Sequence, residues 1–191
     1  TYVGTNASPL TGRYTLAIPG QNDFTQGPAG HGYGILSVSR TGLLVCSARL
    51  PDGTAFSQVV PVSDDSAIPL YGWLYGGKGA ISGWITFTNK PESDLDGTIS
   101  WIKRPMTTSR YYPLGFTNQT EVVGSRYAYP GTTQPVLNFS DGVVEFKLGN
   151  LPQPFTNQIL LAANSRVTNL SSNRLTLSIS VATGEFTGTA L

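Results

Sequence analysis

Apolar and polar residues alternate along most of this chain, and the alternating runs end at glycine, proline, asparagine or aspartate. A period of two residues is typical of a β-strand that buries one of its faces. The run GRYTLAIPG places Tyr14, Leu16 and Ile18 on one face and ends at Pro-Gly. Residues 31–63 predict three further strands, and the Asp-Gly pair at 52–53 is typical of a hairpin turn. The pattern therefore predicts short antiparallel strands.

Alternation continues to the C-terminus and predicts about twelve strands, which begin roughly 8–12 residues apart. In residues 108–133 the alternation is weak, so we expect a long connection with one or two irregular strands. No segment has the 3.6-residue period of an amphipathic helix. We expect an all-β fold, either an antiparallel barrel-like domain or a sandwich, built from a meander of hairpins. Residues 1–191 are expected to form a single domain, with a subdivision near 105–133 as the alternative.

Charged side chains make up only 12% of the 191 residues, and their formal net charge is +1. An average globular protein has about 25% charged residues. Nucleic-acid binding requires a basic surface, which a nearly neutral chain lacks. No apolar run approaches the roughly 18 residues of a membrane-spanning helix. The composition therefore argues against nucleic acid as a partner and against insertion into a membrane.

Cys46 is the only cysteine, so the chain can form no intrachain disulfide and no cysteine-based metal site. In its predicted strand it shares a face with Leu44, Ala48 and Leu50. A thiol without an acidifying neighbour behaves as a small apolar side chain. We expect Cys46 to be buried and unreactive.

The segment YGWLYGGKGAISGWITF, residues 71–87, contains the G-x-x-x-x-G-K spacing of a phosphate-binding loop from Gly72 to Lys78. Such a loop opens a helix, and a serine or threonine follows its lysine to hold magnesium. Here Gly79 follows the lysine, and the next residues alternate as a strand. We therefore predict a hairpin turn with Lys78 in solvent at its tip.

The chain contains no recognisable catalytic set. The single histidine, His31, lies between glycines, and no G-x-S-x-G motif accompanies it. Residues 91–97, PESDLDG, have alternating oxygen ligands that suit calcium but lack the EF-hand pattern. Acidic residues beside serine, glycine or proline commonly serve turns. The candidates for a glycosidase carboxylate pair are Asp64, Asp65, Glu92, Asp94, Asp96, Asp141, Glu145 and Glu185. We expect no enzyme activity, no cofactor and no metal site.

Aromatic residues are the strongest functional candidates. Tyr71, Trp73 and Tyr75 share one face of a predicted strand, and Trp84 and Trp101 lie on the two strands that follow. Flat aromatic side chains can stack on sugar rings while polar neighbours bind the hydroxyl groups. The alternative is that this row fills the core, where aromatic residues pack between strands. The exposure of the rings distinguishes a glycan-binding face from a core.

A series of segments in this order carries a resemblance: GRYTLAIPG, GHGYGILSVSRTGLLVCSARLPDGTAFSQVVPVS, PLYGWLYGGKGAISGWITF, GTISWIKRP, YYPLGFTN, PVLNFSDGVVEF, RVTNLSSNRLTLSIS and GEFTGTAL. Together they resemble an unassigned β-rich module of long, repeat-containing bacterial proteins that are secreted or attached to the cell surface. The resemblance covers nearly the whole chain. It implies an extracellular or cell-surface location and a structural or adhesive role without catalysis.

The same resemblance bears on partners. It implies other copies of the chain, or neighbouring modules of a larger surface protein, because open strand edges pair with other chains. Similar proteins continue past GEFTGTAL with further β sequence, so we expect either a fragment or a last edge completed by another chain. The alternative function is a carbohydrate-binding module that uses the aromatic row, with a polysaccharide as partner.

Overall fold

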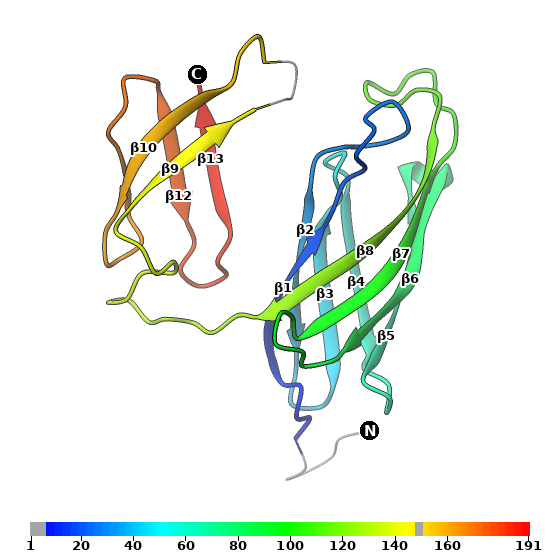
Figure 1. The fold of residues 1–191 in the computed structure, drawn as a ribbon. Helices are drawn as coiled ribbons and strands as arrows, with labels where there is room; N and C mark the ends of the chain where they lie inside the picture. The colour runs from blue at the N-terminus through cyan, green and yellow to red at the C-terminus, as the bar shows by residue number, and fades with distance from the viewer. Residues whose placement is uncertain (1–6, 148–150) are drawn as a thin grey trace. The chain divides into compact units, whose positions relative to one another are not determined.

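The computed structural model describes residues 7–147 and 151–191, and this part of the chain contains thirteen strands (Figure 1). Contacts divide the chain into two compact units, Thr1–Tyr127 and Ala128–Leu191. Every strand pair is antiparallel. Within the described residues, helical structure is confined to one short turn, η1 (Tyr75–Gly77). The predicted all-β meander of hairpins is confirmed.

The first unit forms one sheet of eight strands. They are β1 (Gly12–Ile18), β2 (Gly32–Val38), β3 (Leu43–Arg49), β4 (Ala55–Pro61), β5 (Ala67–Leu74), β6 (Gly79–Phe87), β7 (Leu95–Lys103) and β8 (Phe116–Arg126). Their order in the sheet is β4-β3-β2-β1-β8-β7-β6-β5. Because β1 pairs with β8, the sheet curls until β4 and β5 approach each other (Figure 1). The result is a nearly closed, up-and-down barrel.

The barrel closes at a seam between β4 and β5, where no backbone ladder forms. The side-chain amide of Gln58 on β4 donates to the carbonyl of Pro69 at 3.0 Å and accepts the N–H of Tyr71 at 2.9 Å. Beside it, the ring of Phe56 lies over Gly72, where a Cβ atom would be 2.4 Å from the ring. The side chains of Gln58 and Phe56 therefore hold β4 and β5 together in place of backbone hydrogen bonds.

The inside of the barrel holds one core that is mostly apolar. The residues that the alternation places on one face are all buried: Tyr14, Leu16, Ile18, Leu44, Cys46, Ala48 and Leu50. Burial raises the pKa of the Cys46 thiol to about 11, which keeps it protonated at neutral pH. The prediction of a buried cysteine is confirmed.

The stretch 108–133 contains a regular strand, so the expectation of irregular strands there was wrong. β8 has 11 residues and pairs with both β1 and β7. Its inner face carries Asn118 and Gly124 beside Val122, and these polar and small residues hide the alternation. This strand joins the two halves of the sheet.

The second unit contains five strands in two sheets. They are β9 (Asp141–Phe146), β10 (Phe155–Leu161), β11 (Val167–Asn169), β12 (Leu175–Ile179) and β13 (Phe186–Ala190). One sheet has the order β11-β10-β9, and β12 and β13 form a hairpin. Among the described residues of this unit, Ile159 and Leu161 are the buried aliphatic side chains, while those of β12 are only partly buried. Its core is therefore small.

Candidate functional site

The outer surface of β5 and β6 carries three exposed aromatic side chains, Tyr71, Trp73 and Trp84, which we call the aromatic face. Their exposed fractions are 52%, 69% and 60%. Tyr71 and Trp73 are neighbours on β5 and meet edge to face, with ring centroids 5.9 Å apart. Trp84 lies on β6, opposite Pro69 of β5. The three rings thus share one side of the barrel wall.

The outward direction of these rings follows from their buried neighbours. Leu70 and Leu74 point into the core from β5, as Ile81 and Ile85 do from β6. Successive side chains of a strand point to opposite faces, so the residues at odd positions of β5 and even positions of β6 point outward. The core therefore fixes the aromatic face in place.

Several cross-strand neighbours of the rings are small. In the strand register Trp73 lies opposite Ala80, Tyr71 lies opposite Ser82, and Ser82 lies opposite Ser100 on β7. Short side chains at these positions cover less of the rings than large ones would. The serine hydroxyls add hydrogen-bonding groups beside the rings.

Tyr75 and Trp101, the other two predicted residues, lie apart from the aromatic face. Trp101 is fully buried, and its indole N–H donates to the hydroxyl of Tyr75 at 3.0 Å. The Tyr75 hydroxyl in turn donates to the Asp52 carboxylate at 2.6 Å. Burial first, and then this bond to Asp52, raise the pKa of Tyr75 above its usual value. Both side chains serve the interior of the barrel, so the structure brings together three of the five predicted residues.

The glycine-rich segment between β5 and β6 is a tight turn. Gly76 and Gly77 have φ angles of 63° and 87°, which glycine adopts without strain. Lys78 is exposed after them, and β6 begins at Gly79. The predicted hairpin is confirmed, and a strand stands where a phosphate-binding loop would need a helix.

The candidates for catalysis and calcium binding are dispersed. His31 is exposed, and its Nδ1 accepts the N–H of Gly20 at 3.4 Å. In the segment 91–97, Asp94 accepts the backbone N–H of Arg126 at 2.6 Å, whereas Asp96 pairs with Lys90. Within the described residues, no three His, Cys, Asp or Glu side chains gather as a metal site would require. The remaining carboxylates lie in turns or on the second unit: Asp64, Asp65, Asp141, Glu145 and Glu185.

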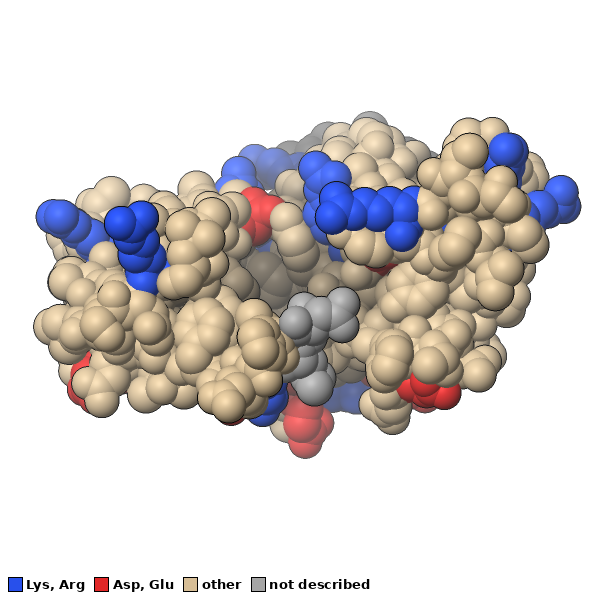
Figure 2. Space-filling model, turned by 90° about the horizontal axis from the view of Figure 1, so that it is seen from above, with Lys and Arg blue, Asp and Glu red and all other residues tan. Residues whose placement is uncertain are grey.

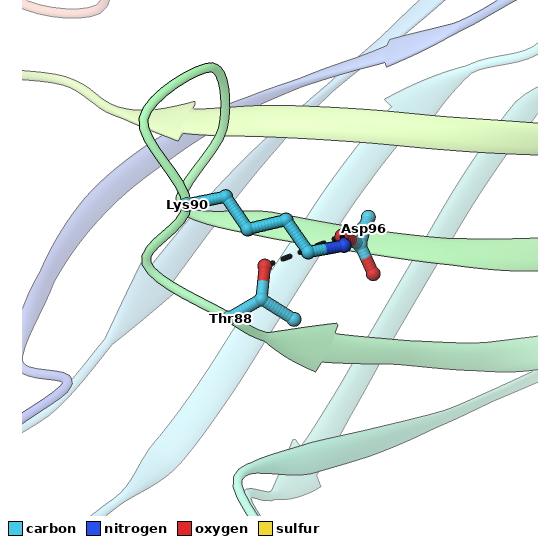
Figure 3. A network of polar contacts seen from close by, with 3 residues as sticks. All are labelled: Thr88, Lys90 and Asp96. Atoms are coloured by element: carbon cyan, nitrogen blue, oxygen red, sulfur yellow. Dashed lines mark hydrogen bonds and ion pairs between the residues drawn. The ribbon is translucent and has the colours of Figure 1, made fainter.

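A hollow of about 390 Å³ lies on the outer surface of β7 and β8. Its lining includes Lys90, Ser93, Asp96, Thr98, Glu121 and Val123. Lys90 and Asp96 form an ion pair, and Thr88 donates to the same carboxylate at 3.3 Å (Figure 3). These contacts, led by the bond from Lys90, lower the pKa of Asp96. The sequence did not lead us to this hollow, because the hollow depends on β8, which we had not expected as a regular strand. The alternate polar residues Thr117, Gln119 and Glu121 were the signal that could have predicted the outer face of that strand.

Charge is sparse on the surface. In the view of Figure 2, the acidic and basic side chains form separate spots on a mostly uncharged surface. No helix of the described residues has the length and apolar character needed to cross a bilayer. Comparisons of the chain with protein-family models, with curated proteins and with solved structures found no match.

Proposed function

We propose that this protein is a non-catalytic extracellular module that binds polysaccharide through the aromatic face. The observation that carries this proposal is the exposure of Tyr71, Trp73 and Trp84 together on one side of a barrel wall. Folding favours the burial of large aromatic side chains, so an exposed group of them marks a binding surface. Their position on strands, with a packed core behind them, keeps the surface rigid and lowers the entropic cost of binding.

Saccharides suit this surface better than other stacking ligands. One side of a pyranose ring presents a flat array of C–H groups that matches an aromatic ring, while the hydroxyls at its edge can bond to Ser82 and Ser100. Bases of single-stranded nucleic acid also stack on aromatic side chains, but such sites lie in basic grooves. Here the formal net charge is +1, and the nearby side chain of Glu121 is acidic.

Affinity electrophoresis through gels that contain dissolved polysaccharides tests this function. We expect at least one of a panel of β-glucan, xylan, glucomannan and chitosan to retard the protein. Trp73→Ala and Trp84→Ala should abolish the retardation without changing the far-ultraviolet circular dichroism spectrum. Tyr33→Ala is the matched control, because Tyr33 is a 46% exposed strand residue on β2, outside the aromatic face. Free migration in every gel, or an equal loss in the control, would overturn the proposal.

The second unit supports a second candidate role, a structural or adhesive one in which copies or neighbouring modules join through strand edges. Among the described strands, β13 pairs with β12 alone, so the backbone groups of its other edge have no ladder partner. Phe186 at the start of β13 is 74% exposed. In the first unit, by contrast, Gln58 bridges the two edge strands. The open edge favours pairing with another strand.

Sedimentation velocity over a wide concentration range tests this second role. We expect dimers or larger species to grow with concentration. Thr187→Lys places a charge on exposed β13 and should prevent the association, whereas Thr117→Lys on the outer face of β8 should not. A monomer at every concentration would exclude assembly through this edge.

A further inference from the structure

The hollow on β7 and β8 continues the aromatic face. Trp84 lies opposite Thr98 in the β6–β7 pair, and Thr98 lies opposite Glu121 in the β7–β8 pair. Neighbouring strands are about 4.8 Å apart, so the backbones of Trp84 and Glu121 are separated by about 10 Å. All three side chains are exposed on the outside of the barrel. A saccharide that stacks on Trp84 and extends across the strands therefore reaches the hollow.

The hollow has a net negative charge, because its one lysine is paired with one of its two carboxylates. Lys90 and Asp96 neutralise each other, and Thr88 completes their network (Figure 3). Within the described residues the Glu121 carboxylate belongs to neither of the ion pairs Lys90–Asp96 and Lys147–Glu145, and its oxygens take part in no hydrogen bond. One uncompensated negative charge therefore lines the hollow.

A second carboxylate extends the acidic character. Glu92 lines an adjoining hollow of about 170 Å³, which shares Ser93 and Val123 with the first. Its carboxylate also has no ion-pair or hydrogen-bond partner within the described residues. The surface that the two hollows form on and beside β8 thus attracts cations and repels anions.

We propose that this hollow binds the protonated amino group of a 2-amino sugar, so that the preferred ligand is a polysaccharide containing glucosamine. The inference rests on the proposed binding of saccharide to the aromatic face. The sugar ammonium donates hydrogen bonds to the Glu121 carboxylate, and the hydroxyl of Thr98 bonds to a neighbouring sugar hydroxyl. Trp84 stacks on the adjacent pyranose ring.

Other charged ligands fit the hollow less well. A divalent cation needs several converging carboxylates, whereas Asp96 is already paired with Lys90 and no metal-binding group of three occurs in the described residues. Polymers of uronic acids carry carboxylates that Glu121 and Glu92 would repel. A cationic saccharide satisfies both the charge and the neighbouring aromatic ring.

Calorimetric titration with three β-1,4-linked hexamers tests the assignment. The hexamers of glucosamine, N-acetylglucosamine and glucose differ at the 2-position alone. Titration at about pH 5.5 keeps carboxylates ionised and the sugar amine protonated. We expect the glucosamine hexamer to bind about tenfold more tightly than the other two at low salt, since a hydrogen bond to a charged group is involved. At about 0.5 M salt this preference should shrink, because screening weakens exposed charges.

Glu121→Gln keeps the shape of the side chain and removes its charge. This variant should bind the three hexamers with affinities within about twofold of one another. Glu145→Gln, which removes a charge from the separate sheet of β9, should keep the preference. Equal affinity of the unmodified protein for all three hexamers, or a preference that survives Glu121→Gln, would overturn the amino-sugar site and leave the aromatic face standing. If no hexamer binds to a protein that the gels do retard, the amino-sugar site is overturned as well. Failure to bind every hexamer and every polysaccharide of the gel panel would overturn saccharide binding itself.

Discussion

The side-chain oxygen of Gln58 on β4 accepts a hydrogen bond from the backbone N–H of Tyr71 on β5 at 2.9 Å. The amide nitrogen of the same residue donates to the carbonyl of Pro69. Gln58 therefore joins the two edge strands of the barrel. Because the ring of Tyr71 belongs to the aromatic face, the same residue also holds the backbone beneath the proposed binding surface.

Replacement of Gln58 should destabilise the protein. Gln58→Ala leaves the N–H of Tyr71 and the carbonyl of Pro69 without their partner, and we expect the free energy of unfolding to fall by about 1–3 kcal/mol. Urea unfolding followed by circular dichroism measures the change. Gln119→Ala is the matched control, because Gln119 is exposed on β8 and its side chain makes no hydrogen bond to any other described residue. Equal stability of the two variants would show that Gln58 does not hold the seam.

Gly72 tests the packing at the same seam. A Cβ atom there would lie 2.4 Å from the Phe56 ring, so Gly72→Ala should lower the free energy of unfolding by about 1–3 kcal/mol. Phe56→Leu removes the obstructing ring atoms, and the cost of Gly72→Ala should be smaller in that background. A double-mutant cycle measures this coupling. Purely additive costs would contradict the contact.

Because of Tyr75, we expect the free energy of unfolding to decrease at alkaline pH. Burial and the bond to Asp52 raise its pKa in the folded protein, whereas in the unfolded chain it ionises near the ordinary value of 10.0. Below that pH the hydroxyl is protonated in both states. Above it the unfolded state alone releases the proton, so the free energy of unfolding falls as pH rises.

Tyr75→Phe should therefore make this fall less steep between about pH 9 and pH 11, as urea unfolding at several pH values would show. Tyr14 and Cys46, whose pKa values burial also raises, contribute in the same direction and leave part of the decrease in the variant. An equally steep decrease in the variant would show that Tyr75 ionises as readily in the folded protein as in the unfolded chain.

The sequence predicted the fold best where one strand face is uniformly apolar. β1 and β3 are such strands, because their inner residues are Tyr14, Leu16 and Ile18 in one case and Leu44, Cys46 and Ala48 in the other. In these strands the burial of alternate residues decides the structure, and this period of two can be read from neighbouring residues without knowledge of distant contacts.

To predict which tryptophans are exposed, one must ask whether each lies on the same strand face as its apolar neighbours. On β6, Trp84 falls out of step with the buried Ile81 and Ile85 and is exposed. On β7, Trp101 is in step with the buried Leu95 and Ile99 and is enclosed. The sequence therefore contained the information that Trp84 is exposed and Trp101 buried, but it lay in the neighbouring residues and not in the tryptophans themselves.

β8 and its hollow depended on contacts between distant residues. The inward Asn118 accepts a hydrogen bond from the side chain of Gln21 at 2.6 Å, a partner 97 residues away. Gly124 on the same strand lies opposite Leu95, whose side chain occupies the space that a larger residue would need. Neither choice follows from a local hydrophobic pattern, so only the polar alternation of Thr117, Gln119 and Glu121 could have indicated where Glu121 lies.

The three tryptophans provide the most direct test of saccharide binding through the aromatic face. Trp73 and Trp84 are exposed, whereas Trp101 is fully buried, with its N–H bonded to Tyr75. Nuclear magnetic resonance of isotope-labelled protein reports each indole N–H separately during titration with the glucosamine and glucose hexamers. We predict that the signals of Trp73 and Trp84 shift together with one dissociation constant while the signal of Trp101 stays in place. A titration that leaves Trp73 and Trp84 unmoved, or that shifts Trp101 instead, would contradict saccharide binding at this face.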